Sequence, residues 1–194
     1  MIQEQSSAKA NLRRTLLQTR QSLPVDVWRQ QSDRLCHRIH NSTLFQQAKT
    51  ILAYFSWRQE PDLGLLFAMN SGQHIWGFPR CVKTDLVWHT CSPDDLAALQ
   101  VGPYGILEPK PSLPILNVGE VDLILVPAIA CDAQGYRLGY GGGFYDRLLS
   151  GTGWQSKPTV GIIFEFALLA SLPIDPWDQP LKAVCTEVGL LRAC

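Results

Sequence analysis

The chain has 194 residues, a formal net charge of zero and hydrophobic residues at 46% of its positions. These values exclude a disordered protein, and zero net charge provides no global field that would recruit nucleic acid or a membrane surface. The length predicts one domain spanning residues 1–194. The charge is uneven, because residues 1–50 carry a net charge of +5, and this indicates local contacts with an anion.

The six cysteines show neither a C-x-x-C pair nor the spacing of metal ligands. The first residues do not read as a signal peptide, and no apolar run reaches the length of a membrane span. We therefore expect reduced thiols and a cytoplasmic protein.

The N-terminal segment predicts two helices. Apolar residues at helical spacing follow the possible cap Ser6-Ser7, and Pro24 ends this first helix. Lys9 and Arg13 are four residues apart, so their side chains emerge side by side. A second helix is expected over residues 26–39.

Strands and helices then alternate along the chain. Residues 101–119 are rich in proline and glycine and predict a long loop, a type of segment that is often functional. Alternation predicts an α/β fold with three α/β/α layers, a largely parallel, Rossmann-like central sheet and a helical N-terminus. The expected strands are 50–55, 74–78, 86–90, 122–127, 159–164 and 183–187, and further helices are expected to begin at Pro61 and near residues 93, 144 and 165.

Residues 137–147 read Arg-Leu-Gly-Tyr-Gly-Gly-Gly-Phe-Tyr-Asp-Arg and hold four of the 15 glycines. A glycine-rich turn between a strand and a helix lets the backbone approach a phosphate. The segment matches neither the P-loop nor the G-x-G-x-x-G fingerprint. Asp146 is either an acid at the positive end of a helix or a ligand of a phosphate-bound Mg²⁺. A purely structural turn and an anion site both remain open.

The run Arg-Leu-Gly-x-Gly-x-Gly-Phe-Tyr-Asp resembles the signature of the 5-formyltetrahydrofolate cyclo-ligase family, also called 5,10-methenyltetrahydrofolate synthetases. The resemblance extends over essentially the whole chain. Several motifs in the same order are more specific than one glycine-rich turn. The other matching motifs are Lys9-x-x-Leu12-Arg13, Glu60, Phe78-Pro79-Arg80, Glu108-Pro109, residues 122–127, Leu172-Pro173, Trp177-Asp178 and Thr186-Glu187.

The resemblance implies an enzyme that binds ATP, Mg²⁺ and a reduced folate. It implies that Lys9, Arg13 and Arg137 are the catalytic cations, and that Asp146 and Asp178 ligate Mg²⁺. The folate is expected to contact Phe55, Glu60 and Tyr104. The nucleotide is expected to contact Lys9, Arg13, Arg137, Leu138, Gly139, Tyr140, Gly141, Gly142, Gly143, Phe144 and Tyr145.

The implied reaction converts 5-formyltetrahydrofolate into 5,10-methenyltetrahydrofolate and releases ADP and phosphate. ATP phosphorylates the formyl oxygen, and N10 of the folate then attacks the activated carbon. Phosphoryl transfer depends on positioning and charge neutralisation rather than on a side-chain nucleophile. Glu60 is expected to accept hydrogen bonds from pterin N–H donors. We expect a monomer that binds this small molecule, with or without a polyglutamate tail, and neither nucleic acid nor a membrane.

Three residues depart from the family pattern. Gly142 stands where some members have lysine, Phe144 replaces a common tyrosine, and Ala167 stands where many members have glutamine. The first two leave the anion site intact, whereas the third puts in doubt a polar side chain at that position.

Two other functions remain open from the sequence. One is a sugar-phosphate isomerase or acyl transferase whose glycine-rich turn holds a phosphate, and the other is a non-catalytic protein that binds folate or ATP. His37 and His40 lack the third ligand of a metal site. Among the six tryptophans, Trp57 is expected to line a pocket, and the others, Trp177 included, are expected to pack in the interior.

Overall fold

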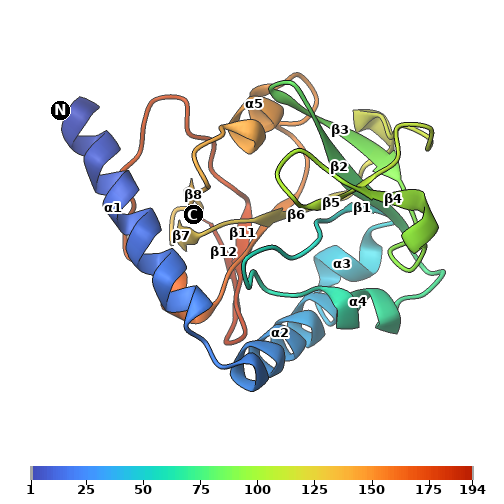
Figure 1. Ribbon diagram of the computed structural model, residues 1–194, viewed down its shortest axis with the longest axis horizontal. Helices are drawn as coiled ribbons and strands as arrows, with labels where there is room; N and C mark the ends of the chain where they lie inside the picture. Colours follow the sequence, from blue (N-terminus) through green and yellow to red (C-terminus); the bar gives the residue numbers. More distant parts are fainter. Residues whose placement is uncertain (1, 194) are drawn as a thin grey trace.

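A mixed but mainly parallel sheet forms the centre of the protein in the computed structural model, which describes residues 2–193. Within these residues seven strands follow the order β12-β11-β9-β6-β1-β2-β3, and the expected α/β fold is confirmed (Figure 1). The inner strands run parallel, and the two edge strands pair antiparallel to their neighbours. In chain order they are β1 (Thr50–Leu52), β2 (Ile75–Val82), β3 (Asp85–Thr90), β6 (Leu123–Pro127), β9 (Thr159–Ile162), β11 (Ala183–Cys185) and β12 (Leu190–Arg192).

Helices cover both faces of this sheet. Figure 1 shows α2 (Val25–His40), α3 (Thr43–Gln47) and α4 (Gly64–Met69) on one side and α5 (Phe144–Ser150) on the other. The long α1 (Ile2–Gln21) packs with the α5 side, because its Leu16 belongs to the same buried cluster as Leu149. The predicted three layers are therefore present.

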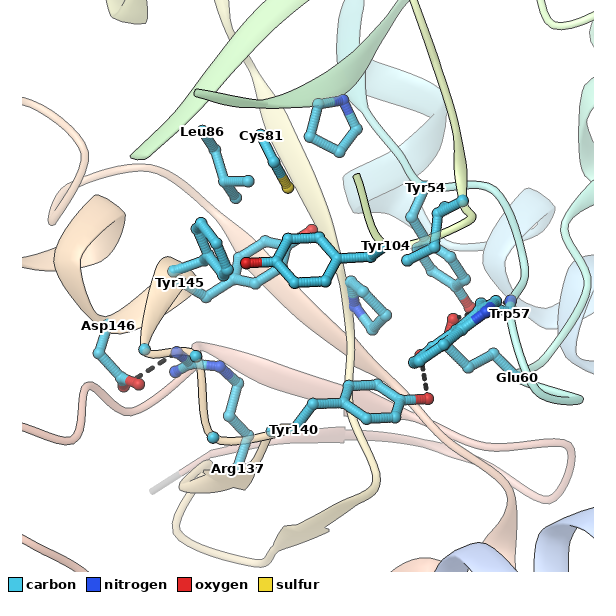
Figure 2. Close-up of a pocket in the computed structure, with 18 of the residues that line it drawn as sticks. Tyr54, Trp57, Glu60, Cys81, Leu86, Tyr104, Arg137, Tyr140, Tyr145 and Asp146 are labelled. Atoms are coloured by element: carbon cyan, nitrogen blue, oxygen red, sulfur yellow. Dashed lines mark hydrogen bonds and ion pairs between the residues drawn. The ribbon is translucent and has the colours of Figure 1, made fainter. Parts of the chain in front are cut away.

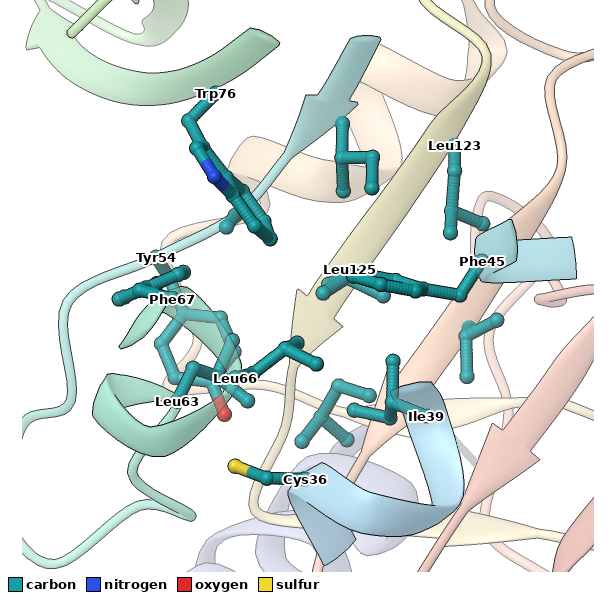
Figure 3. Close-up of a cluster of buried hydrophobic side chains, with 14 of the residues drawn as sticks. Cys36, Ile39, Phe45, Tyr54, Leu63, Leu66, Phe67, Trp76, Leu123 and Leu125 are labelled. Carbon is teal, nitrogen blue, oxygen red and sulfur yellow. The ribbon is translucent and has the colours of Figure 1, made fainter. Parts of the chain in front are cut away.

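Strand β6 shows why the sequence reads as an uninterrupted apolar run. Leu123 and Leu125 enter the cluster built with α2, α3 and α4, whereas Ile124 and Val126 enter the cluster built with α1 and α5. A parallel strand buried on both faces requires apolar side chains at successive positions. Figure 3 shows the first cluster, in which the Trp76 ring meets Phe67 edge-on at 4.8 Å.

Shorter elements flank the main sheet. The expected loop at 101–119 is partly ordered, since β4 (Leu99–Val101) pairs with β5 (Leu107–Pro109) and a 3-10 turn covers Val118–Glu120. A separate small sheet has the order β10-β7-β8, with β7 (Ala130–Asp132), β8 (Arg137–Leu138) and β10 (Leu168–Leu169). This small sheet leads directly into the glycine-rich segment.

Some expected element boundaries are wrong. The helix expected at 165–172 is a 3-10 turn over Glu165–Ala167 followed by β10, because Leu168 and Leu169 pair with β7. Helix α4 begins at Gly64 rather than at Pro61, and α1 begins at Ile2, before the expected cap. Strand β12 was not expected.

The expectation of unpaired thiols holds for the described cysteines. Cys36, Cys81, Cys91, Cys131 and Cys185 are free, and Cys194 lies outside the described residues. Among residues 2–193, no helix combines the length and apolarity needed to cross a membrane.

Candidate active site

A cavity of about 780 Å³ opens at the carboxyl ends of β1 and β6. Ligands of α/β proteins bind at this edge of the sheet. The residues that follow β1 form one wall and the glycine-rich segment forms another (Figure 2). Every predicted site residue lines the cavity: Lys9, Arg13, Phe55, Glu60, Tyr104, Arg137, Leu138, Gly139, Tyr140, Gly141, Gly142, Gly143, Phe144, Tyr145, Asp146 and Asp178.

One face of α1 carries the basic residues of the site. Lys9, Arg13, Leu16 and Arg20 follow spacings of four, three and four, so they lie on one side of the helix. Leu16 packs in the core, and the Lys9 and Arg20 side chains are buried beside it. Arg13 donates from Nε to the carbonyl oxygen of Gly139 at 2.8 Å. Arg13 therefore ties this helix directly to the glycine-rich segment.

The glycine-rich segment adopts a backbone that requires glycine. Gly141 and Gly143 have φ angles of +99° and +66°, in the left-handed region. A Cβ at Gly143 would also stand 2.7 Å from Nη1 of Arg147. The bare backbone and the neighbouring Arg13 leave room and positive charge for an anion.

Lys9 is held by two carboxylates in the turn before β11. Its Nζ lies 2.6 Å from Oδ2 of Asp175 and 2.5 Å from Oδ2 of Asp178. The backbone N–H of Asp175 donates to the same oxygen of Asp178 at 2.7 Å. Burial lowers the pKa of Lys9, but the hydrogen bonds to Asp175 and Asp178 outweigh it and raise the pKa. Lys9 is therefore a fixed ammonium group.

A second ion pair joins Arg137 and Asp146. Arg137 Nη2 lies 2.9 Å from Oδ1 of Asp146, and the N–H of Gln179 donates to that same oxygen at 3.1 Å. The structure thus pairs two predicted cations with the two predicted metal ligands, Asp146 and Asp178. The contacts among described residues use one oxygen of each carboxylate and leave the other available.

Glu60 is a buried carboxylate at the opposite end of the cavity. The Tyr140 hydroxyl donates to Oε1 at 2.9 Å, and the N–H of Trp57 donates to Oε2 at 3.1 Å. Burial raises the pKa of Glu60 to about 7, and the nearby charge of Arg20 and the bonds from Tyr140 and Trp57 only partly oppose this effect. Such a group accepts hydrogen bonds from a ligand without being surrounded by water.

Aromatic rings line the cavity near Glu60. The rings of Trp57 and Tyr140 lie 5.1 Å apart, and Phe55 stacks on Phe78 at 4.3 Å. Figure 2 shows Tyr104 reaching across the cavity between Glu60 and Asp146. An acceptor between flat apolar surfaces suits a planar ligand that carries N–H donors.

Several contributors were missed by sequence reasoning. Asp175 holds Lys9, and the buried Arg20 reaches the Tyr140 hydroxyl. Trp177 was expected to pack in the interior, but it lines the cavity with an exposed fraction of 61%. Its position directly before Asp178, a predicted site residue, is the signal that could have identified it.

Other candidates lie elsewhere. Nδ1 of His40 lies 3.1 Å from Oδ1 of Asn70, and His37 lines a separate surface groove. Across residues 2–193, no group of three or more potential metal ligands occurs. Ala167 is buried in the cluster beside α1 and α5, so this departure does not alter the cavity.

The fold and the cavity suit an α/β enzyme of the class that binds an anionic ligand next to a flat, hydrogen-bonding one. The sequence pattern of the 5-formyltetrahydrofolate cyclo-ligase family matches residues 5–187. The chain therefore belongs to the 5-formyltetrahydrofolate cyclo-ligase family, and the expected resemblance is confirmed. It is 34% identical over 187 residues to the 5-formyltetrahydrofolate cyclo-ligase of Mycolicibacterium smegmatis, covering 92% of this chain and 93% of that protein.

Solved structures show the same fold. The 5,10-methenyltetrahydrofolate synthetase of Aquifex aeolicus superposes with a TM-score of 0.84 and 31% identity, covering 95% of this chain and 92% of that one. The corresponding protein of Mycoplasma pneumoniae gives a TM-score of 0.73 at 22% identity, covering 92% of this chain and 98% of that one. The second comparison bears on the fold alone.

Proposed function

We propose that the protein converts 5-formyltetrahydrofolate into 5,10-methenyltetrahydrofolate in a reaction that consumes ATP and requires Mg²⁺. The observation that carries this proposal is that one cavity joins a cationic, glycine-rich wall to an aromatic wall with a buried carboxylate. The first wall suits a triphosphate, and the second suits a pterin.

Three cations serve the nucleotide end. Lys9, Arg13 and Arg137 line the cavity, and each is held by named partners rather than moving freely in solvent. Cations fixed in advance neutralise charge that moves during phosphoryl transfer without a reorganisation cost. The backbone of Gly139 to Gly143 lies beside them and can approach the phosphates closely.

Asp146 and Asp178 fit the needs of a magnesium ion. Mg²⁺ is commonly bound through one or two carboxylates together with phosphate oxygens and water. Each of these aspartates keeps one carboxylate oxygen outside its contacts with described residues. When bound, Mg²⁺ would neutralise phosphate charge at the moment of transfer.

The folate end orients the reacting groups. Glu60 accepts hydrogen bonds from the N–H donors of the pterin, and the rings of Phe55 and Tyr104 contact the faces of the pterin ring. The γ-phosphoryl group passes to the formyl oxygen as ADP leaves. N10 then attacks the formyl carbon, the carbon–oxygen bond breaks with release of phosphate, and water takes up the N10 proton. The protein supplies alignment and charge for both steps, and neither step requires a covalent bond to a side chain.

We further propose that the enzyme works as a monomer in the cytoplasm. The free thiols among the described cysteines suit a reducing compartment. The bound folate is proposed with or without its polyglutamate tail.

A coupled assay tests the proposed function. We expect ATP turnover only when 5-formyltetrahydrofolate and Mg²⁺ are both present, with an absorbance of the methenyl product in the near ultraviolet. Lys9→Ala or Arg13→Ala should lower turnover far more than folate binding. Folate binding without any change in absorbance would support the non-catalytic alternative. ATP-independent turnover of a sugar phosphate or an acyl substrate would support the other alternative.

A further inference from the structure

A continuous line of polar contacts connects α1, the glycine-rich segment and the folate end of the cavity. The Arg20 guanidinium donates from Nη2 to the Tyr140 hydroxyl, and that hydroxyl donates to Oε1 of Glu60 at 2.9 Å. Three residues far apart in sequence thus share one hydrogen-bonded chain. Figure 2 shows its last link, with the Tyr140 ring extending from the glycine-rich segment toward Glu60.

Arg20 is well suited to hold this chain in place. Its exposed fraction is only 3%, and its Nε donates to the carbonyl oxygen of Arg58 at 3.0 Å. A further N–H lies 3.4 Å from the carbonyl oxygen of Ala128. A planar guanidinium with donors on several sides can be fixed in this way, whereas lysine offers a single nitrogen. Arg20 therefore presents Tyr140 with a donor of fixed direction.

Tyr140 has a different role from its glycine neighbours. Its backbone belongs to the segment that we assign to the phosphates, but its hydroxyl contacts only groups at the folate end among the described residues. Its ring also lies 5.1 Å from the ring of Trp57, and the backbone N–H of Trp57 donates to the other carboxylate oxygen of Glu60. The side chain thus belongs to the folate end of the cavity.

We propose that Arg20 and Tyr140 are positioning residues that fix the Glu60 carboxylate for the folate. Through Tyr140 they also connect the backbone that we assign to the phosphates with the Glu60 carboxylate at the folate end of the cavity. The inference rests on the proposed function and deepens it. Each Glu60 oxygen receives one donor from the protein, and its remaining lone pair points to ligand donors in one defined arrangement.

The charges around Glu60 agree with this role. The groups that face it are Arg20 from α1, Tyr140 from the glycine-rich segment, Tyr54 after β1 and Tyr145 in α5. Of these four, Arg20 carries the positive charge. Removal of Arg20 should raise the pKa of Glu60 further, because burial would then be opposed only by hydrogen bonds.

The test compares two pairs of variants in the full-length enzyme. Tyr140→Phe removes the hydroxyl that contacts Glu60, and Tyr136→Phe is its control, because Tyr136 lies four residues earlier and outside the cavity lining. Arg20→Met removes the charge, Arg20→Lys retains it, and Arg14→Met is the control on the exposed side of α1. Circular dichroism and Tm establish that each variant is folded.

We expect Tyr140→Phe to raise the KM for 5-formyltetrahydrofolate about tenfold and to leave the KM for ATP within about twofold of its original value, since a hydrogen bond to a charged group is lost. Arg20→Met should move the acidic limb of the kcat/KM profile for folate to higher pH, and Arg20→Lys should move it less. The two controls should leave both parameters unchanged.

Two results would overturn the inference. Tyr140→Phe could match Tyr136→Phe in folate KM and pH profile, or it could raise the KM values for ATP and folate equally, as a distorted glycine-rich segment would. If the wild-type enzyme turns over 5-formyltetrahydrofolate, either result would reject the positioning role and leave the proposed function standing. Failure of the wild-type enzyme to consume this substrate would reject the proposed function as well.

Discussion

The buried Glu60 should cost the protein stability whenever it is ionised. In the substitution Glu60→Gln, the neutral amide has nearly the shape of the protonated carboxyl group. Burial raises the pKa of Glu60 from its ordinary value of 4.5 to about 7 in the folded protein. Between these two pH values the folded state binds more protons at this position than the unfolded chain does. Stability therefore falls as pH rises through this window.

The size of the effect follows from the two pKa values. At about 1.4 kcal/mol for each pH unit, the shift from 4.5 to about 7 corresponds to a loss of about 3 kcal/mol above the folded-state pKa. For a chain of 194 residues this corresponds to roughly 6–12 °C in Tm. The loss should be absent at low pH and complete above about pH 8.

The assay is thermal unfolding of the ligand-free wild type and Glu60→Gln across this pH range. We plot the difference in Tm, because the other titrating groups contribute equally to both proteins. The Tm of the variant should rise relative to that of the wild type as pH rises, and by more than the Tm of the control Asp94→Asn, which removes an exposed carboxylate. A difference in Tm between Glu60→Gln and wild type that stays constant across the pH range would refute this reasoning.

Three further predictions concern other parts of the protein. Lys9→Met should lower the free energy of unfolding by about 2 kcal/mol near neutral pH, because Asp175 and Asp178 would face each other without a cation. This loss is smaller than the loss on breaking a fully buried ion pair. In urea unfolding, stability should recover at acidic pH or after the added change Asp175→Asn. Gly135→Ala should lower the free energy of unfolding by at least about 2 kcal/mol, since φ is +86° and the new Cβ would stand 2.3 Å from the carbonyl oxygen of Leu181. The control Gly189→Ala places its Cβ in open space and should be nearly neutral in the same unfolding assay. Tyr104→Ala should raise the folate KM by about tenfold and Tyr104→Phe should not, because the ring makes the contact.

Each of these three predictions has a result that would contradict it. Equal stability losses for Lys9→Met at acidic and neutral pH would show that packing, rather than carboxylate repulsion, is lost. Equal losses for Gly135→Ala and Gly189→Ala would rule out a backbone clash. A similar rise in KM for both Tyr104 variants would assign the contact to the hydroxyl group.

Local patterns predicted the central layers of the fold well. The apolar run at 122–127 predicts a buried parallel strand, and β6 is one. Pairing partners were harder to predict. Residues 165–172 contain apolar positions at helical spacing, yet Leu168 and Leu169 pair with β7, a strand more than 30 residues earlier. The sequence carries no local mark of such a partner, and the pairing outweighs helix propensity.

The site was predicted through its motif residues, and the residues that support them were missed. Lys9 and Arg13 were identified by the family resemblance, whereas Arg20, on the same helix face, was not. Its importance depends on a contact with Tyr140, 120 residues away, and only the folded chain brings the two together. Asp175 was missed for the same reason, since its partner Lys9 lies at the other end of the chain.

The placement of Lys9 also has a consequence for how the protein is made. Its two carboxylate partners lie 166 and 169 residues further along the chain. During synthesis the first helix emerges long before residues 175–178 leave the ribosome, so the cationic side of the cavity cannot be completed co-translationally until the chain is nearly finished. Contacts of such long range close slowly. Refolding should therefore recover catalytic competence last. A nascent chain that ends before residue 175 also lacks β11 and β12, and it should be inactive even if the strands from β1 to β9 have paired.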